Sequence, residues 1–79
     1  METNQIFEEV KNVIVKLFGS DVGELTEDTR LREINGWDSL GHMSFIGELE
    51  EKFNIKFSFA EVISLTTVKS VVGCIEKHN

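Results

Sequence analysis

Ser39 is the side chain of this sequence whose type and position best suit chemistry. It lies in the run 36–43, where Asp38 can cap a helix that begins at Ser39. Backbone N–H groups and the positive end of the helix dipole meet at such a position, so a hydroxyl there tolerates a phosphate. A long loop before the helix lets another enzyme reach this hydroxyl. The pattern therefore indicates a serine hydroxyl that can carry a phosphate and that an enzyme can reach.

His42 offers a second chemical interpretation, because it lies three residues after Ser39 and can meet it on one helix face. A nucleophile and its base also need a third group that orients the base. The sequence has no such group at a plausible spacing, no Gly-x-Ser-x-Gly turn and little room for an oxyanion hole. We therefore expect no catalytic residue, and we place His42 at the surface or in a groove.

Metal ligands are few in this sequence. With His42, His78 and a single cysteine, Cys74, no metal site of the usual ligand spacings can be assembled. The acidic residues of the segment 19–38 do not match a calcium loop. We expect no metal site, and we expect Cys74 to be a small core or boundary residue of the last helix.

The composition limits the class of protein. The 79 residues include 14 acidic and 8 basic side chains, for a net charge of −6, which argues against a nucleic-acid partner. The same charge favours protein partners with basic patches. No stretch approaches a membrane span, and residues 1–5 lack the basic start of a secretory signal. We expect one soluble, cytoplasmic, monomeric domain over residues 1–79.

Hydrophobic periodicity predicts an all-α chain of four helices, at about 4–18, 39–53, 58–63 and 67–77. Thr3 or Asn4 is available to cap the first helix and Gly19 to end it. Ser58 and Glu61 have capping-box spacing at the start of the short third helix, although the alternating apolar residues there also permit a strand. The expected architecture is a four-helix bundle with a long first loop and a short third helix.

The long first loop, residues 19–38, shows no sustained period. We expect four apolar side chains to pin it to the core: Val22, Leu25, Leu31 and Ile34. On a helical wheel, the apolar arc of 39–53 that should face the core holds Leu40, Met43, Phe45, Ile46, Leu49 and Phe53. The opposite side, which should face solvent, holds Gly41, Ser44, Glu48, Glu51 and Lys52.

Asp38-Ser39-Leu40, in this order of helices, resembles the motif of the acyl carrier protein family, which includes peptidyl carrier domains. The resemblance extends over nearly the whole chain, through residues 49–53 to Leu65-Thr66-Thr67-Val68. It implies that a phosphopantetheinyl transferase uses coenzyme A to attach 4′-phosphopantetheine to Ser39, flanked by Asp38 and Leu40. The thiol of that arm carries an acyl or aminoacyl group as a thioester between partner enzymes, and the carrier itself catalyses nothing.

Departures from the family pattern concern the docking surface. Fatty-acid carriers usually bear acids two and five residues after the serine, where this sequence has Gly41 and Ser44. The resemblance then implies contacts with loading ligases, synthases or transferases that have basic or mixed docking patches. The residues expected to make them are Trp37, Leu40, Gly41, Ser44, Gly47, Glu48, Glu50, Glu51 and Phe59.

Three functions stay open on this pattern. The apolar, weakly charged surface near Ser39 favours a specialised carrier of a polyketide, aminoacyl or polysaccharide pathway. A housekeeping carrier of fatty-acid synthesis is the alternative within the family. An unmodified helical module that works only by docking is the alternative outside it. Trp37 likewise has two interpretations, a partner contact or a loop aromatic packed against the core.

Overall fold

Helix α1 (Thr3–Phe18) shows how the sequence pattern sets the packing. In the computed structural model, which describes residues 2–78, its apolar stripe is buried against the rest of the chain. The fully covered side chains on this stripe are Ile6, Val10, Val13 and Ile14. They recur at helical spacing, so one face of α1 forms one wall of the core.

The ends of α1 follow different rules. Neither Thr3 nor Asn4 caps the helix, so that prediction is wrong. Glu2 is the cap residue, and its backbone N–H donates to the side chain of Gln5 across 3.0 Å. This bond satisfies a donor at the helix start, which is the purpose of a cap. At the other end the chain leaves the helix at Gly19 with a φ of 96°, as predicted, because glycine adopts positive φ without strain.

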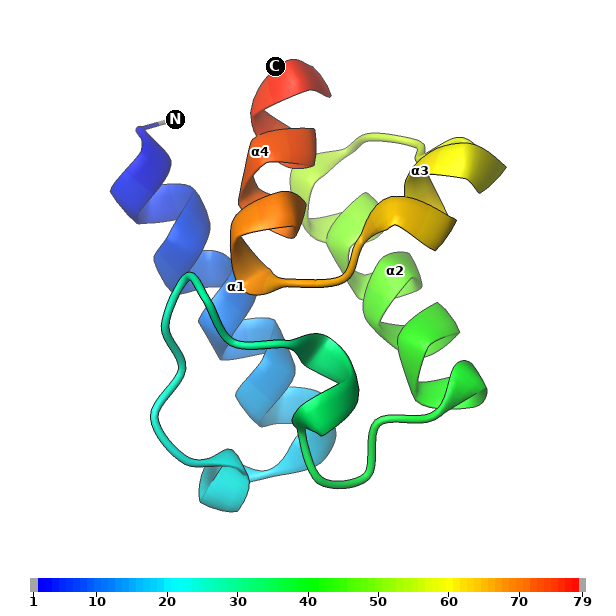
Figure 1. Cartoon of the computed structure of the whole chain (residues 1–79). Coiled ribbons are helices and arrows are strands. Elements are labelled where there is room, and N and C mark those ends of the chain that lie inside the picture. The colour runs from blue at the N-terminus through cyan, green and yellow to red at the C-terminus, as the bar shows by residue number, and fades with distance from the viewer. Residues whose placement is uncertain (1, 79) are drawn as a thin grey trace.

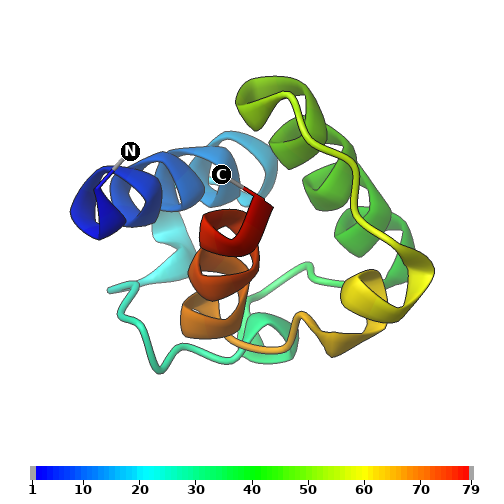
Figure 2. The ribbon, with the colours of Figure 1, turned by 90° about the horizontal axis from the view of Figure 1, so that it is seen from above.

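Three further helices complete the bundle: α2 (Ser39–Phe53), α3 (Phe59–Ser64) and α4 (Val68–His78). Each boundary lies within one residue of the prediction. The strand alternative near residue 58 is wrong, because Ser58 and Glu61 exchange the two hydrogen bonds of a capping box. α1 packs against both α2 and α4, and α3 lies on the side of α4 away from α1 (Figures 1 and 2). None of the helices in residues 2–78 has the length and apolar character needed to cross a bilayer.

The long loop that leads to α2 is fixed by backbone hydrogen bonds to the start of α4. The N–H of Leu31 donates to the carbonyl of Thr66 at 3.0 Å, and that of Val68 donates to the carbonyl of Thr29 at 3.1 Å. Two short 3₁₀ turns, Ser20–Val22 and Leu31–Glu33, lie in the loop and were not predicted, since three residues carry no period. The four predicted anchors do pack: Leu31 and Ile34 are buried, and Val22 and Leu25 lie partly buried against the core.

The apolar face of α2 is narrower than its wheel predicts. Phe45, Ile46 and Leu49 are buried, but Leu40 and Met43 are exposed. Met43 lines a groove that stays open between α2 and the short α3, and Leu40 lies in the first turn of α2.

Gly41 also differs from the prediction, which places it on the solvent side. It is half-buried, because the last residue of α1 packs over the first turn of α2. A Cβ at Gly41 would lie 2.9 Å from Cε1 of Phe18, closer than carbon atoms approach. An acid at this position would therefore press against the Phe18 ring.

Candidate functional site

Ser39 begins α2 and is exposed. Its position is set by Asp38, whose extended backbone ends the loop and whose Oδ1 accepts a hydrogen bond from the N–H of Gly41 at 2.7 Å. The carbonyl of Asp38 accepts from the N–H of His42 at 2.8 Å, which starts the helical ladder. Asp38 is thus the N-cap that the sequence predicts. The Ser39 hydroxyl stands at the positive end of the helix dipole, open to a partner enzyme.

A groove of about 590 Å³ opens beside Ser39 between α2, α3 and the loop. Arg32 supplies a positive charge to its lining and Asp38 a negative one. Its other lining residues are mostly apolar or aromatic: Leu31, Trp37, Ser39, His42, Met43, Val62, Ile63, Leu65 and Thr66. A phosphate-linked chain on Ser39 would therefore find a cation and an apolar wall next to its attachment point.

Trp37 connects the loop to this groove and to the core. Its indole ring stacks on Phe18 with the centroids 4.5 Å apart and meets the ring of Phe45 edge-on at 4.9 Å. Its Nε1–H donates to Nδ1 of His42 at 3.2 Å, and Nε2 of His42 lies 3.1 Å from the carbonyl of Val62 in α3. This arrangement matches the interpretation of Trp37 as a loop aromatic packed against the core.

His42 lines the groove, as predicted. Because its Nδ1 accepts from Trp37, the ring proton is on Nε2, where it reaches Val62. Both ring nitrogens are thus occupied by structural hydrogen bonds. The arrangement gives His42 a role in holding α2 and α3 together.

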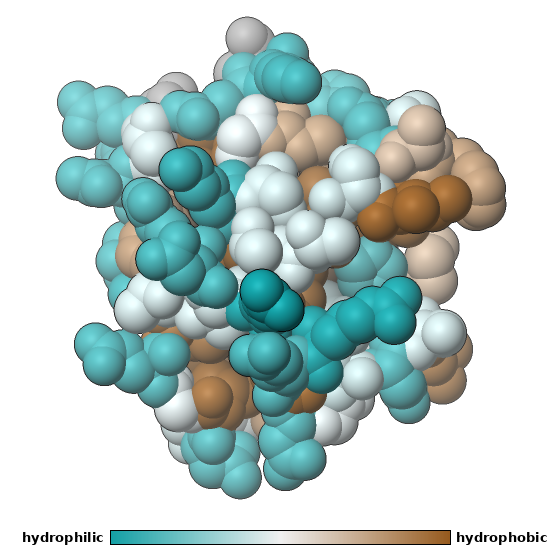
Figure 3. Space-filling view, viewed as in Figure 1, coloured by the Kyte–Doolittle hydropathy of each residue, from teal (hydrophilic) through white to brown (hydrophobic). Residues whose placement is uncertain are grey.

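Four large apolar side chains of α2 and α3 are exposed, and two of them, Met43 and Ile63, line the groove. We call them the apolar patch: Leu40 (77%), Met43 (55%), Phe59 (80%) and Ile63 (63%). Figure 3 shows apolar atoms gathered at the edge of the molecule that Figure 1 assigns to α3. The sequence indicated Leu40 and Phe59 as contact residues but missed Met43 and Ile63. An exposed apolar patch of this kind is typical of a docking surface.

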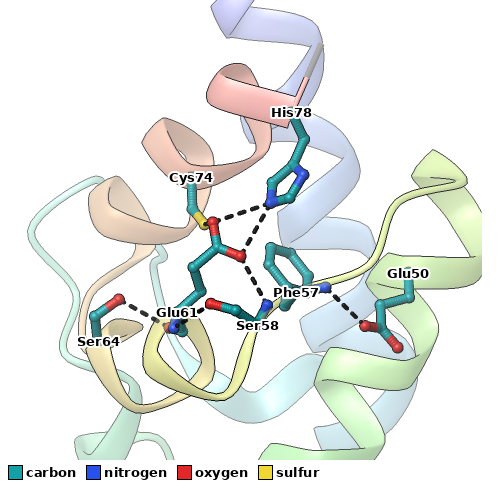
Figure 4. Close-up of polar contacts among 7 residues, drawn as sticks. All are labelled: Glu50, Phe57, Ser58, Glu61, Ser64, Cys74 and His78. Atoms are coloured by element: carbon teal, nitrogen blue, oxygen red, sulfur yellow. Dashed lines mark hydrogen bonds and ion pairs between the residues drawn. The ribbon is translucent and has the colours of Figure 1, made fainter.

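The acidic side chains of α2 differ in whether they make contacts within the molecule. Glu48 pairs with Lys16 of α1 at 2.9 Å, and Glu50 accepts from the backbone N–H of Phe57 at 2.9 Å (Figure 4). Glu51 is exposed, as are the neighbouring positions Ser44 and Gly47. The negative charge expected at this end of α2 is therefore partly taken up within the molecule.

The family model for the phosphopantetheine attachment site matches residues 8–75 of this chain. An acyl carrier protein of Thermotoga maritima is 33% identical over 73 residues, which cover 92% of this chain and 90% of that protein. The chain belongs to the acyl carrier protein family. A second carrier of the family, from Helicobacter hepaticus, is 39% identical over 72 residues, or 91% of this chain and 95% of that one.

Solved structures agree with this membership. A structure described as a candidate acyl carrier protein from Mycobacterium tuberculosis has a TM-score of 0.83 and 28% identity, and the match covers 91% of this carrier and 96% of that chain. Acyl carrier proteins are carriers and not catalysts. They bear covalently attached 4′-phosphopantetheine, placed by a phosphopantetheinyl transferase, and they deliver acyl groups to biosynthetic enzymes. An exposed serine at a capped helix start, next to a groove, fits such a group.

Proposed function

We propose that Ser39 is the residue that bears 4′-phosphopantetheine and that the carrier serves a specialised biosynthetic pathway. The observation that supports the first part is the exposed Ser39 hydroxyl at the start of α2, capped by Asp38 and open to the groove. In the transfer, the Ser39 oxygen forms a bond to the phosphorus next to pantetheine in coenzyme A. The nucleotide half leaves, and the hydroxyl proton passes to a base of the transferase. The attached arm supplies a terminal thiol, on which an acyl or aminoacyl group is carried as a thioester.

Residues around Ser39 have separate parts in this proposal. Asp38 fixes the helix start so that the hydroxyl faces solvent. Arg32, in the lining of the same groove, can face the phosphate of the arm, since guanidinium groups pair well with phosphate. Leu40 stands exposed one residue after the serine and can contact the transferase.

The second part of the proposal rests on the docking surface. Of the apolar patch, Leu40 follows Ser39 directly, and Met43 and Ile63 line the same groove as Ser39. Gly41 is packed under Phe18, and Ser44 carries no charge. Partners that fit this face have an apolar centre, with a basic group reaching Glu51 farther along α2. A face of this kind differs from the strongly acidic face expected of a housekeeping carrier. We further propose that the carrier acts as a monomer in the cytoplasm.

The attachment is tested by incubating the carrier with coenzyme A and a broad-specificity phosphopantetheinyl transferase. We expect the intact mass to rise by one phosphopantetheinyl group. The gain should vanish in Ser39→Ala and persist in Ser44→Ala, which removes a nearby exposed serine of the same helix. An unchanged mass in the wild-type chain would support the unmodified docking module instead.

The pathway is tested with the modified carrier and a malonyl transferase of bacterial fatty-acid synthesis. We expect the kcat/KM of this transferase with the modified carrier to be at least about tenfold below its kcat/KM with a fatty-acid carrier. This difference corresponds to about 1.4 kcal/mol of transition-state binding. Ser44→Glu should recover part of the loss by restoring one acid on α2. Equal efficiency for the two carriers would show a housekeeping role.

A further inference from the structure

Three potential ligand side chains meet between α3 and α4, away from the groove at Ser39. Cys74 and His78 lie four residues apart on α4 and share one face of that helix. Glu61 reaches them from α3: its Oε2 lies 3.3 Å from Sγ of Cys74 and 3.0 Å from Nε2 of His78 (Figure 4). All three ligand atoms lie within 4.8 Å of one another.

These donors are the ones that zinc-class cations prefer. Zinc binds cysteine sulfur at about 2.3 Å and histidine nitrogen or carboxylate oxygen at about 2.0–2.2 Å, in tetrahedral geometry. Such bond lengths place ligand atoms about 3.4 Å from each other. Two of the pairs already lie at 3.0 and 3.3 Å, close to that spacing, and the third pair, Cys74 with His78, lies within 4.8 Å.

The ligands are held by neighbours that do not compete for the cation. The backbone N–H of Ser58 donates to Oε1 of Glu61 at 2.8 Å, and Oε1 also lies 3.2 Å from Nε2 of His78. Oε2 is the carboxylate oxygen that contacts both Cys74 and His78. The ring of Phe57 meets the His78 ring edge-on, with centroids 5.6 Å apart and planes at 83°. Contacts of this outer kind orient metal ligands and are a regular part of metal sites.

We propose that Glu61, Cys74 and His78 bind one divalent cation of the zinc class, with water in the fourth position. Glu61 and His78 keep 29% and 26% of their side chains exposed, so the ion enters from solvent. On binding, a metal–sulfur bond replaces the S–H bond of Cys74 and the proton is released to solvent. The site ties α3, which carries Phe59 and Ile63, to α4.

Without the cation, the same three groups form hydrogen bonds. Burial, followed by the bond and the charge of Glu61, raises the pKa of the Cys74 thiol to about 11, so the thiol donates to the carboxylate. This arrangement ties the two helices more weakly and is the competing interpretation. The two interpretations differ in whether a thiolate–metal bond forms.

The test uses the full-length Ser39→Ala carrier, reduced and freed of metal with a chelator. This background excludes the thiol of the arm, so Cys74 is the one thiol, and the result does not depend on the proposed attachment at Ser39. Titration with Co²⁺ should give a thiolate-to-cobalt charge-transfer band at one equivalent. Zn²⁺ should then displace the cobalt with a dissociation constant below about 10 µM, or more than about 7 kcal/mol of binding.

Variants distinguish ligands from neighbours. Cys74→Ser should abolish the band, and His78→Gln should weaken zinc binding at least tenfold. Glu51→Gln, which removes an exposed acid on α2, should change neither. Zinc should also raise the melting temperature of the parent but not of Cys74→Ser, whose helicity is checked by circular dichroism. Zinc binding weaker than the stated constant, or a cobalt band that persists in Cys74→Ser, overturns the proposal.

Discussion

The indole N–H of Trp37 and Nδ1 of His42 lie 3.2 Å apart in a hydrogen bond that joins the long loop to α2 directly beside Ser39. The other ring nitrogen of His42 lies 3.1 Å from the carbonyl of Val62. Loop, α2 and α3 are therefore connected through one imidazole ring, and this ring forms part of the groove wall. The geometry of the site depends on a residue that performs no chemistry.

His42→Ala should destabilise the carrier by about 1–3 kcal/mol, because it leaves a half-buried indole N–H and a carbonyl without partners. Urea unfolding followed by the fluorescence of Trp37, the single tryptophan, measures the loss. Ser44→Ala, at an exposed position of the same helix, should stay within about 0.5 kcal/mol of the wild type. A His42→Ala carrier as stable as Ser44→Ala would show that the hydrogen bonds of His42 to Trp37 and Val62 do not hold the helices together.

Gly41→Asp and Ser44→Asp should behave differently, although both add the acid that fatty-acid carriers bear. Gly41→Asp places a Cβ 2.9 Å from the Phe18 ring and should cost about 1–3 kcal/mol through overpacking. Ser44→Asp stays in solvent and should change the free energy of unfolding by about 0.5 kcal/mol or less. Chemical denaturation of the pair, side by side, gives the comparison. Equal stabilities would mean that Phe18 moves aside at little cost.

Leu40→Ser should slow the attachment of phosphopantetheine without weakening the fold. Leu40 is 77% exposed, so its loss removes contact area for the transferase and little from the core. We expect kcat/KM of the transferase to fall about tenfold, or about 1.4 kcal/mol. The free energy of unfolding should be unchanged within about 0.5 kcal/mol. Phe45→Ala, from the buried side of α2, should instead cost about 3–5 kcal/mol of stability. Full transferase activity in Leu40→Ser would remove this residue from the docking surface.

Glu61 should make metal-free stability depend on acid. The N–H of Ser58, then Cys74 and His78, lower the pKa of Glu61 to about 2 from 4.5. A carboxyl group with a depressed folded-state pKa stabilises the fold above its unfolded pKa, and this contribution disappears as the pH falls through the interval between the two values. With a chelator present to remove metal, the pH is lowered from about 5 to about 3. Over this range the unfolding free energy of the wild type should fall more than that of Glu61→Gln. Parallel losses in the two proteins would contradict the shifted pKa.

Local rules account for the parts of the fold that the sequence predicts. Asp38 before Ser39, and Ser58 three residues before Glu61, are short-range patterns whose hydrogen bonds form within one helical turn. The helix boundaries follow because hydrophobic periodicity is also local. The anchors Leu31 and Ile34 could be predicted in an otherwise irregular loop, because isolated large apolar side chains there are buried against the core and not left in solvent.

Contacts between elements escape such rules. Trp37 and His42 are five residues apart across a loop–helix junction, a spacing that no periodic pattern indicates. The position of Phe18 over Gly41 requires the crossing of α1 and α2, which the sequence alone does not define. Cys74 and His78 are visible as neighbours on one helix face, but their partner Glu61 comes from another helix. A search for ligand spacings within one segment therefore misses the cluster.

The backbone bonds between the long loop and the start of α4 have a consequence for how the carrier matures. Leu31 is held by the carbonyl of Thr66, and Thr29 by the N–H of Val68, so the loop gains its shape from residues translated well after Ser39. Until α4 has been made, the loop before Ser39 lacks these two backbone hydrogen bonds. The transferase should thus meet a finished site only when synthesis has passed α4. Chains released before that point are expected to be modified more slowly than the full-length carrier.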